Sequence, residues 1–267
     1  MTLEVDFPPP LSPYPFAGKV IAITGASSGI GLATTLLLWT RGATVSAMSN
    51  NAEGMAELDV ALQEKSKEAL PGQKFYTRVA DVSKEGEVKA WINETIEKFG
   101  RLDGAANIAG AVHNYNKMAD TVTEDFDFSI NMNTRGVYYC MRSQIPQMKS
   151  GSAIVNMSSI SATQTEPGIS LYGASKAAIS TLSTATATEY GPKGIRVNAI
   201  ATGLTLSKRL QSVGKEYVEP GIQATALKRG AKPIEQAQVI VFLLSDEASN
   251  VTGTVVRCDG GALALQY

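Results

Sequence analysis

The chain has 267 residues, of which 44% are hydrophobic and 18% charged, a composition that excludes a disordered or fibrous protein. Its 24 Lys and Arg against 25 Asp and Glu leave a net charge of −1, so no basic field favours nucleic acid or an anionic membrane as a partner. Two cysteines and one histidine exclude a disulfide scaffold, favour a reducing compartment, and leave little material for a metal site. We therefore expect a cytoplasmic protein without a metal.

The N-terminal segment is rich in proline, with five among the first 17 residues. This composition predicts an arm over residues 1–17 that is extended on the surface or forms a loose tail. The N-terminal segment does not have a basic stretch followed by an apolar one, so a secretory signal is not expected. The sequence has no run of about 18 apolar residues, so a membrane span is not expected.

From residue 18 onward, short apolar segments alternate with helical ones. Strands are expected at residues 19–24, 44–48, 74–80, 104–108, 153–157, 196–200 and 254–257. Helices are expected at residues 29–41, 54–69, 84–99, 123–148, 171–190 and 233–244. Strands that are apolar throughout are buried on both faces, and their alternation with helices indicates parallel βαβ units. The pattern predicts one α/β domain over residues 18–267, doubly wound and Rossmann-type, with a seven-stranded parallel sheet flanked by helices. An irregular insert at about residues 204–232 is expected to shape a substrate site.

A glycine-rich segment, TGASSGIG at residues 24–31, follows the first strand and opens the first helix. The glycines let the backbone turn tightly and approach a pyrophosphate, while the helix N-terminus presents free N–H groups. Glycines also end strands for steric reasons alone. The position between a strand and a helix favours dinucleotide binding.

The end of the second strand bears on the form of the coenzyme. An acidic residue there would bond a ribose 2′-hydroxyl and repel a 2′-phosphate, but this chain has Ser49 and Asn50. Neutral donors tolerate a phosphate, so we favour NADP(H) over NAD(H), although no nearby Arg or Lys would bind the phosphate strongly. The alternative is that Ser49 and Asn50 only cap the next helix.

Tyr172 and Lys176 are four residues apart at the start of a predicted helix, so their side chains share one face. A free tyrosine has a pKa of about 10, and a nearby ammonium group favours the phenolate. Tyr172 is therefore a candidate general acid for ketone reduction and a base for the reverse reaction. The spacing alone is common, and an unrelated surface pair is the alternative.

The chain resembles a single-domain short-chain dehydrogenase/reductase over roughly residues 18–262. The segments that resemble the family's motifs, in order, are TGASSGIG at 24–31, Asp81-Val82, Asn107-Ile108-Ala109-Gly110, Asn133-Thr134-Arg135-Gly136, GSAIVNMSS at 151–159, Tyr172 to Lys176, and Asp259-Gly260-Gly261. Ile108 replaces the second Asn of the family's NNAG motif. Thr202 replaces the proline that commonly follows the sixth strand, and the loss of proline's fixed φ bears on coenzyme affinity rather than on coenzyme use.

The resemblance implies four catalytic residues. Ser159 and Tyr172 would hydrogen-bond the substrate oxygen, with Ser158 as the runner-up to Ser159. Lys176 would bind the nicotinamide ribose and lower the pKa of Tyr172. Asn133, with Asn131 as its competitor, would hold a water that links Lys176 to solvent, or would only bond backbone at a helix kink.

The resemblance also implies the cofactor-binding set. It comprises Gly25, Ser27, Ser28, Gly29, Ile30, Gly31, Ser49, Asn50, Asp81, Val82, Asn107, Ala109, Gly110, Tyr172, Lys176, Thr202, Gly203, Thr205 and Ser207. Candidate substrate contacts are His113, Ser161 and Leu204, although a solvated loop position is the alternative for His113.

The expected function is that of an NADP(H)-dependent ketoreductase or secondary alcohol dehydrogenase for a small, ring-sized, partly apolar metabolite. The alternatives are isomerisation, dehydration or cyclisation in the same pocket, or a dinucleotide binder without chemistry. The family's pairing of long helices implies a homodimer or homotetramer through residues 126–148 and 177–187. The proline-rich arm and residues 161–165 loosely resemble reductases of specialised metabolism.

Overall fold

The computed structural model describes residues 12–211 and 215–262, and within them a seven-stranded sheet of order β3-β2-β1-β4-β5-β6-β7. The strands are β1 (Val20–Thr24), β2 (Thr44–Ser49), β3 (Phe75–Val79), β4 (Leu102–Asn107), β5 (Met148–Ser159), β6 (Arg196–Thr202) and β7 (Val255–Cys258). Every neighbouring pair is parallel. The predicted doubly wound α/β fold is confirmed, and the strand order reverses between β1 and β4.

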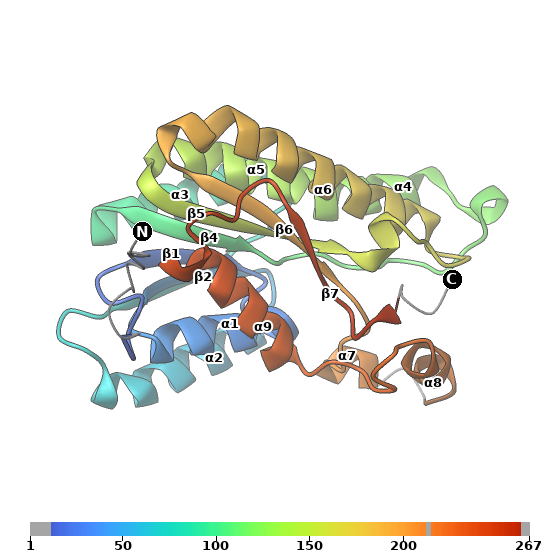
Figure 1. The fold of residues 1–267 in the computed structure, drawn as a ribbon, viewed down its shortest axis with the longest axis horizontal. Helices are drawn as coiled ribbons and strands as arrows, with labels where there is room; N and C mark the ends of the chain where they lie inside the picture. The colour runs from blue at the N-terminus through green and yellow to red at the C-terminus, as the bar shows by residue number, and fades with distance from the viewer. Residues whose placement is uncertain (1–11, 212–214, 263–267) are drawn as a thin grey trace, which may run out of the picture.

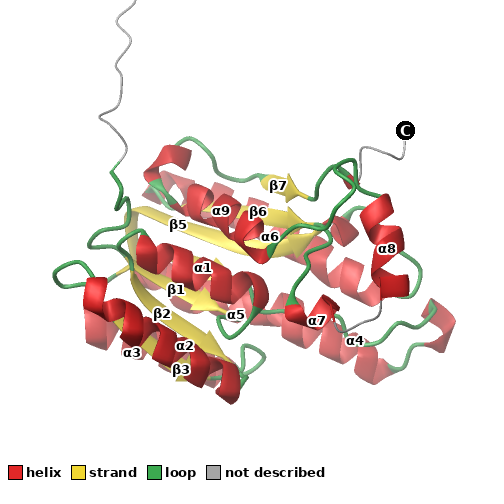
Figure 2. Ribbon diagram, turned by 90° about the horizontal axis from the view of Figure 1, so that it is seen from below, coloured by secondary structure: helices red, strands yellow, loops and turns green. Residues whose placement is uncertain are grey.

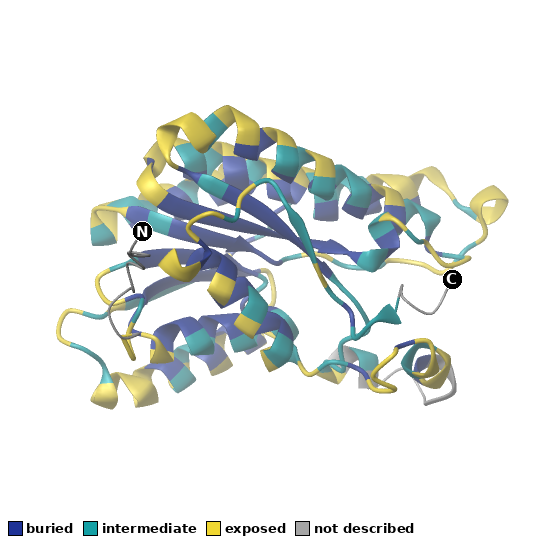
Figure 3. Cartoon of the chain, viewed as in Figure 1, coloured by how far each residue is buried: buried dark blue, intermediate teal, exposed yellow. Residues whose placement is uncertain are grey.

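Helices cover both faces of this sheet (Figure 1). On one face lie α1 (Gly29–Thr40), α2 (Ala52–Lys65) and α9 (Pro233–Leu244), and on the other lie α3 (Glu85–Phe99), α5 (Gly136–Gln144) and α6 (Ser170–Tyr190). Covering both faces is what strands without polar alternation require. The sheet is accordingly the most deeply buried layer (Figure 3).

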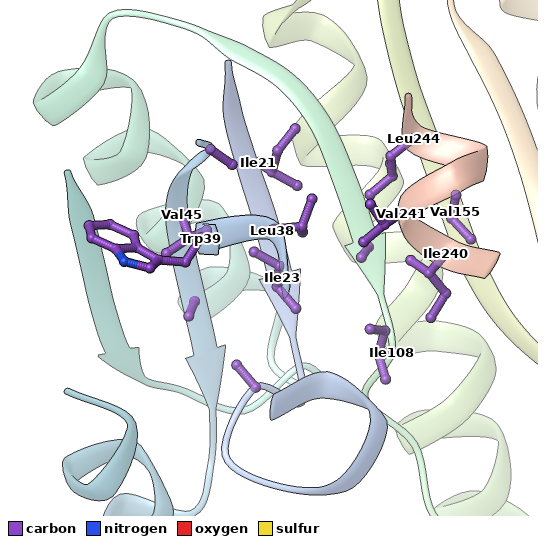
Figure 4. Close-up of a cluster of buried hydrophobic side chains, with 14 of the residues drawn as sticks. Ile21, Ile23, Leu38, Trp39, Val45, Ile108, Val155, Ile240, Val241 and Leu244 are labelled. Carbon is purple, nitrogen blue, oxygen red and sulfur yellow. The ribbon is translucent and has the colours of Figure 1, made fainter. Parts of the chain in front are cut away.

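Two hydrophobic cores lie on opposite faces of the sheet. All five residues of β1 are buried, and successive side chains of a strand point to opposite faces. Ile21 and Ile23 therefore join the core beneath α1 and α9, which Figure 4 shows, whereas Ala22 joins the core beneath α3, α5 and α6. Trp39 and Trp91 are both buried, one in each core.

The single helix predicted at residues 123–148 is wrong. The chain forms α4 (Thr123–Ser129), a π-helical segment (Ile130–Arg135) and α5, then a short 3-10 turn (Ile145–Gln147). Pro146 explains the end of α5, because proline restricts the preceding residue and lacks an N–H donor. Met148 then already belongs to β5, which runs longer than the predicted 153–157.

Other boundaries shift by less. The helix predicted at 54–69 is α2 followed by a 3-10 turn (Ser66–Glu68). The insert predicted as irregular at about 204–232 contains α7 (Lys208–Gln211) and α8 (Lys215–Gln223). The strands β5, β6 and β7 point toward the end of the molecule where α4, α7 and α8 lie (Figure 2). In α/β sheets, this carboxyl edge is where ligands bind.

Part of the predicted arm belongs to the core. Phe16 is fully buried with the residues beneath α1, and its backbone N–H donates to Arg41 O at 3.1 Å. Residues 1–11 of the arm lie outside the described residues.

We expect Phe16→Ala to lower the free energy of unfolding by about 3 kcal/mol, because it leaves a cavity beneath α1. Urea unfolding followed by circular dichroism measures this change. Tyr14→Ala is the control, since Tyr14 is 45% exposed and its loss should change stability by less than about 1 kcal/mol. Equal effects of the two variants would contradict the role of Phe16.

No helix among the described residues is both long and apolar enough to cross a membrane.

Candidate active site

The glycine loop is fixed to the end of β4 at the point where the strand order reverses. Thr24 Oγ1 accepts hydrogen bonds from the N–H groups of Ile108, at 2.9 Å, and Ala109, at 3.1 Å. Gly25 has a φ of +70°, and a Cβ there would lie 3.0 Å from Ala109 Cα. Glycine is thus required both by the backbone conformation and by the close approach of the two loops.

The first turn of α1 fits a dinucleotide diphosphate. A Cβ on Gly31 would lie 2.0 Å from Gly25 O, so the loop can fold this tightly only without that side chain. Ser28 is exposed and makes no side-chain hydrogen bond to the helix start, and no acidic residue lies in the first turn. The helix N-terminus, with its partial positive charge, therefore has no anionic side chain competing for it.

The end of β2 lies against this loop. Ser49 Oγ is 2.8 Å from Ser27 Oγ, and both residues are buried, whereas Asn50 is exposed. The alternative that Ser49 and Asn50 cap the next helix is wrong. Asn51 is the N-cap of α2, and its side chain accepts from Gly54 N at 3.2 Å.

Tyr172 and Lys176 come from the first turns of α6, as predicted. Lys176 is 2% exposed, its Nζ lies 5.6 Å from the centroid of the Tyr172 ring, and Nζ donates to Met157 O at 2.8 Å. Burial lowers the pKa of Lys176 to about 7, because the charged ammonium loses hydration. The amine therefore gains and loses a proton near neutral pH.

Burial also has the largest effect on the pKa of Tyr172. It raises the pKa of the phenol above its ordinary value, while the hydrogen bond with Ser159 acts in the opposite direction. The expected lowering by Lys176 is not found in the protein alone, because the amine is itself desolvated and donates to the Met157 carbonyl. The phenol is consequently protonated at neutral pH and is ready to donate.

Asn133 lies in the π-helical segment and is fully buried. Its amide makes two hydrogen bonds of 3.0 Å with the backbone of Ala111, donating to O and accepting from N. A Cβ on Gly110 would lie 2.6 Å from Asn133 Oδ1 and 3.0 Å from Lys176 Nζ, so Asn133 and Lys176 meet at this glycine. The side chain of Asn133 thus supports the loop after β4, and its proposed water stays a prediction.

Two neighbouring hydroxyls hold the helix that carries Lys176. Ser158 Oγ donates to Lys176 O at 2.9 Å, and Thr134 Oγ1 donates to Ser175 O at 3.0 Å. Because Ser158 is fully buried and turned toward α6, the interaction with Tyr172 belongs to Ser159. Apart from their adjacency to Ser159 and Asn133, no sequence signal predicts these two supporting roles.

Two predicted cofactor residues have side chains engaged elsewhere. The amide of Asn107 is buried and bonds Gln144 and Asn156, so only its backbone is free to face a coenzyme. Asp81 Oδ1 accepts from the N–H and the hydroxyl of Ser83. Val82 packs beside Gly136, where a Cβ would lie 2.9 Å from Val82 Cγ2.

The segment after β6 lies beside the glycine loop. A Cβ on Gly29 would be 3.6 Å from Ser207 Cβ. Gly203 packs against Asp259, whose Cα would be 2.7 Å from an added Cβ. Thr205 Oγ1 donates to Gly203 O at 3.2 Å. The segment that has Thr202 in place of the family's proline therefore contains an internal hydrogen bond.

A small pocket of about 10 Å³ opens beside Tyr172. It is lined by Val112, His113, Asn114, Asn116, Thr121, Asp125, Ser129 and residues 168–172. His113 thus lines the same pocket as Tyr172. Of the other substrate candidates, Ser161 donates its N–H to Ser159 Oγ at 3.1 Å, and Leu204 lies 3.5 Å from the Cβ position of Gly221 in α8.

Sequence reasoning missed Asp125. Its position in the first turn of a helix has an ordinary explanation, favourable interaction with the helix dipole, and no sequence signal connects it with His113. Among the described residues, no group of three His, Cys, Asp or Glu side chains is placed to hold a metal ion.

Comparisons with known proteins agree with this geometry. A family model described as enoyl-(acyl carrier protein) reductase matches residues 25–262. The short-chain dehydrogenase/reductase ABA4 of Pyricularia oryzae is 37% identical over 253 residues, covering 92% of each chain. Levodione reductase of Leifsonia aquatica is 36% identical over 259 residues, covering 93% of this chain and 96% of that protein.

A solved structure agrees as well. The short-chain dehydrogenase from Burkholderia cenocepacia J2315, in complex with NADP, superposes with a TM-score of 0.86 at 28% identity, covering 93% of this chain and 99% of that one. The matches span the glycine loop, Ser159, Tyr172, Lys176 and the closing Asp259-Gly260-Gly261. The chain therefore belongs to the short-chain dehydrogenase/reductase family of oxidoreductases.

Proposed function

We propose that the protein is an NADP(H)-dependent ketoreductase that interconverts a ketone and a secondary alcohol on a small, partly apolar, ring-sized substrate. The observation that carries the proposal is the placement, at the carboxyl edge of the sheet, of the half-buried Tyr172 phenol next to Ser159 and the buried Lys176 amine, which lies 3.0 Å from the Cβ position of Gly110 after β4. A protein that only binds a dinucleotide has no use for these desolvated groups.

The chain's own residues provide proton transfer and positioning. When bound, the nicotinamide supplies or accepts the hydride. Ser159 hydrogen-bonds the substrate oxygen, and Tyr172 donates its phenolic proton to that oxygen as the carbonyl becomes an alcohol. Protonated Lys176 stabilises the phenolate that is left. With a pKa of about 7, Lys176 can also return a proton to Tyr172 near neutral pH.

The direct test is coenzyme oxidation by the purified full chain. We expect NADPH to be oxidised in the presence of a ring ketone, with one secondary alcohol formed for each NADPH consumed. Product identification by mass spectrometry separates this outcome from isomerisation, dehydration or cyclisation, which would change the substrate without net coenzyme consumption. Unchanged coenzyme across the ketone panel would contradict the proposal.

The proposed preference for NADP(H) rests on the residues at the end of β2. Ser49 and Asn50 provide a hydroxyl and an amide where an acid would repel a 2′-phosphate, and a family member of known structure was solved with NADP.

We expect Ser49→Asp to weaken NADPH binding by about 10- to 100-fold and to leave NADH binding equal or tighter, because a carboxylate repels the phosphate and accepts from a ribose hydroxyl. Fluorescence titration of both coenzymes measures this. Ser66→Asp, an exposed position at the far end of α2, is the charge-matched control. An unchanged ratio of the two affinities would show that Ser49 does not face the 2′-position.

A homodimer or homotetramer is part of the same proposal. Exposed aromatic side chains on two helices support it: Phe126 on α4 is 50% exposed and Tyr138 on α5 is 42% exposed. Burial of such surface between copies is a common source of association. Light scattering on the purified chain gives the mass of the assembly.

A further inference from the structure

Asp125 is a buried carboxylate that the reaction described above does not use. It is 4% exposed, lies in the first turn of α4, and forms part of the wall of the pocket beside Tyr172. It accepts hydrogen bonds from Asn114 Nδ2 at 2.6 Å, Asn116 Nδ2 at 3.3 Å and Val122 N at 3.4 Å. Although burial acts to raise the pKa of Asp125, these donors and His113 outweigh it and lower the pKa, so the group stays ionised.

His113 is held between Asp125 and an aromatic ring. Its Nε2 lies 3.6 Å from Asp125 Oδ1, and its ring stacks on Phe128 with centroids 4.3 Å apart and planes at 26°. The side chain is still 41% exposed, and it lines the same pocket as Tyr172. An imidazole fixed on two sides is preorganised, and the ring nitrogen that does not face Asp125 is the one left to hydrogen-bond a ligand.

The pocket between His113 and Tyr172 is small and largely polar. Asparagine, threonine, serine and aspartate side chains contribute to its lining, and its volume of about 10 Å³ is near the minimum that holds one water molecule. The loop that carries His113 is tied across the pocket, because Asn116 N donates to Gly168 O at 3.1 Å. Val112, Ile169 and Leu171 also line the pocket, but a space of this size fits a single oxygen rather than a larger hydrocarbon group, and its mainly polar lining favours a hydrogen-bonding occupant.

We infer that this pocket is a subsite for a second oxygen of the substrate, so that the substrate is a ring dione or hydroxy ketone. His113 hydrogen-bonds that oxygen through the ring nitrogen that does not face Asp125, and Asp125 is a positioning residue that holds the imidazole and the surrounding loop. The inference rests on the proposed function, because it places the first oxygen at Tyr172. It extends that function by assigning the class of substrate.

A comparison of matched substrates tests the inference. Wild-type protein and His113→Leu are assayed with NADPH against cyclohexanone, cyclohexane-1,4-dione and 4-hydroxycyclohexanone. We expect His113→Leu to lower kcat/KM by about 10- to 100-fold for the two oxygenated rings, mainly through KM, and by less than about 3-fold for cyclohexanone. His113→Gln, which keeps a side chain able to donate and to accept a hydrogen bond, should recover part of the loss.

The positioning role of Asp125 has its own comparison. Asp125→Asn keeps the shape of the side chain and removes its charge, and Asp127→Asn makes the same change at an exposed position of the same helix. We expect Asp125→Asn to reduce the preference for the oxygenated rings, and Asp127→Asn to leave it unchanged. Saturation-transfer NMR with cyclohexane-1,4-dione and cyclohexanone reports binding independently of turnover, and thermal melting confirms that both variants are folded.

The outcomes separate this inference from the proposed function. If wild-type protein reduces cyclohexanone and the dione, but His113→Leu lowers both alike or neither, the second-oxygen subsite is wrong and the ketoreductase proposal stands. If no ketone is reduced and neither ring compound binds, the proposed function fails and the subsite falls with it. A selective loss on the oxygenated rings, recovered by His113→Gln, supports both.

Discussion

Replacement of Tyr172 by Phe is expected to lower kcat for ketone reduction by about 10²- to 10⁴-fold, the usual contribution of a positioned general acid. Phenylalanine keeps the half-buried ring beside Lys176 and removes only the hydroxyl that interacts with Ser159. The change therefore removes the proton donor with little effect on packing. Coenzyme binding should change by less than about 3-fold, because the hydroxyl acts on the substrate oxygen.

Single-turnover kinetics with NADPH and fluorescence titration of the coenzyme measure these two quantities separately. Tyr190→Phe is the matched control, since Tyr190 is the last residue of the same helix, far from Tyr172 along α6. Its activity should stay within about 2-fold of wild type. Full activity in Tyr172→Phe would remove the acid–base assignment and leave Lys176 and Ser159 without the role argued above.

Replacement of Lys176 by Met is expected to abolish most activity and yet to stabilise the fold. Burial lowers the pKa of this lysine from 10.5 to about 7. The charged form of Lys176 is therefore less stable in the folded state than in the unfolded state, which lowers the stability of the fold. Methionine fills a similar volume without a charge, although it loses the bond to Met157 O. At pH 7 we expect the free energy of unfolding to rise by up to about 4 kcal/mol.

The sign of the pH dependence follows from the two pKa values. Between pH 7 and 10.5 the unfolded chain holds more protons on Lys176 than the folded chain does, so this group makes wild-type stability rise with pH in that window. Below pH 7 both states are protonated and the disadvantage of the folded state is constant. The stability difference between Lys176→Met and wild type should therefore be largest at or below pH 7 and fall below about 1 kcal/mol near pH 10.

Urea unfolding of both proteins at several pH values measures this difference directly. Other titrating groups are common to the two proteins and cancel in the comparison. Lys193→Met, at an exposed site after α6, should show no such difference at any pH. A stability difference that does not vary between pH 7 and 10 would contradict the lowered pKa of Lys176.

The strands and the glycine loop were predictable because their signals are local. β1 and β2 are buried along their full length. Short segments of strand-forming residues between helical ones identified them, although β2 (TVSAMS) also contains three hydroxyl side chains. The loop between β1 and α1 followed from its position. The four candidate catalytic residues stay a prediction, and only resemblance to a family brought them together as a set. Spacing alone placed Tyr172 and Lys176 on one face of a helix, but it did not place Ser159 or Asn133 beside them.

The errors have a common physical cause, which is tertiary contact overriding local pattern. The π-helical segment exists where Asn133 bonds the backbone of Ala111, 22 residues away in sequence, so periodicity at residues 123–148 could not predict it. The prolines around Phe16 predict an arm, although Phe16 packs beneath α1. Asp125 meets His113 through loop geometry, for which the sequence has no periodic signal.

The amide cluster of Asn107, Gln144 and Asn156 restricts how the strands can align. Asn107 and Asn156 are direct partners in the β4–β5 register, and Gln144 completes the set from α5. A shift of one residue between these strands would leave the amide groups buried without hydrogen-bond partners. Each such unpaired polar group is strongly unfavourable in the interior. The cluster thus acts against misaligned sheets during folding, a selective role that apolar side chains at the same positions would not have.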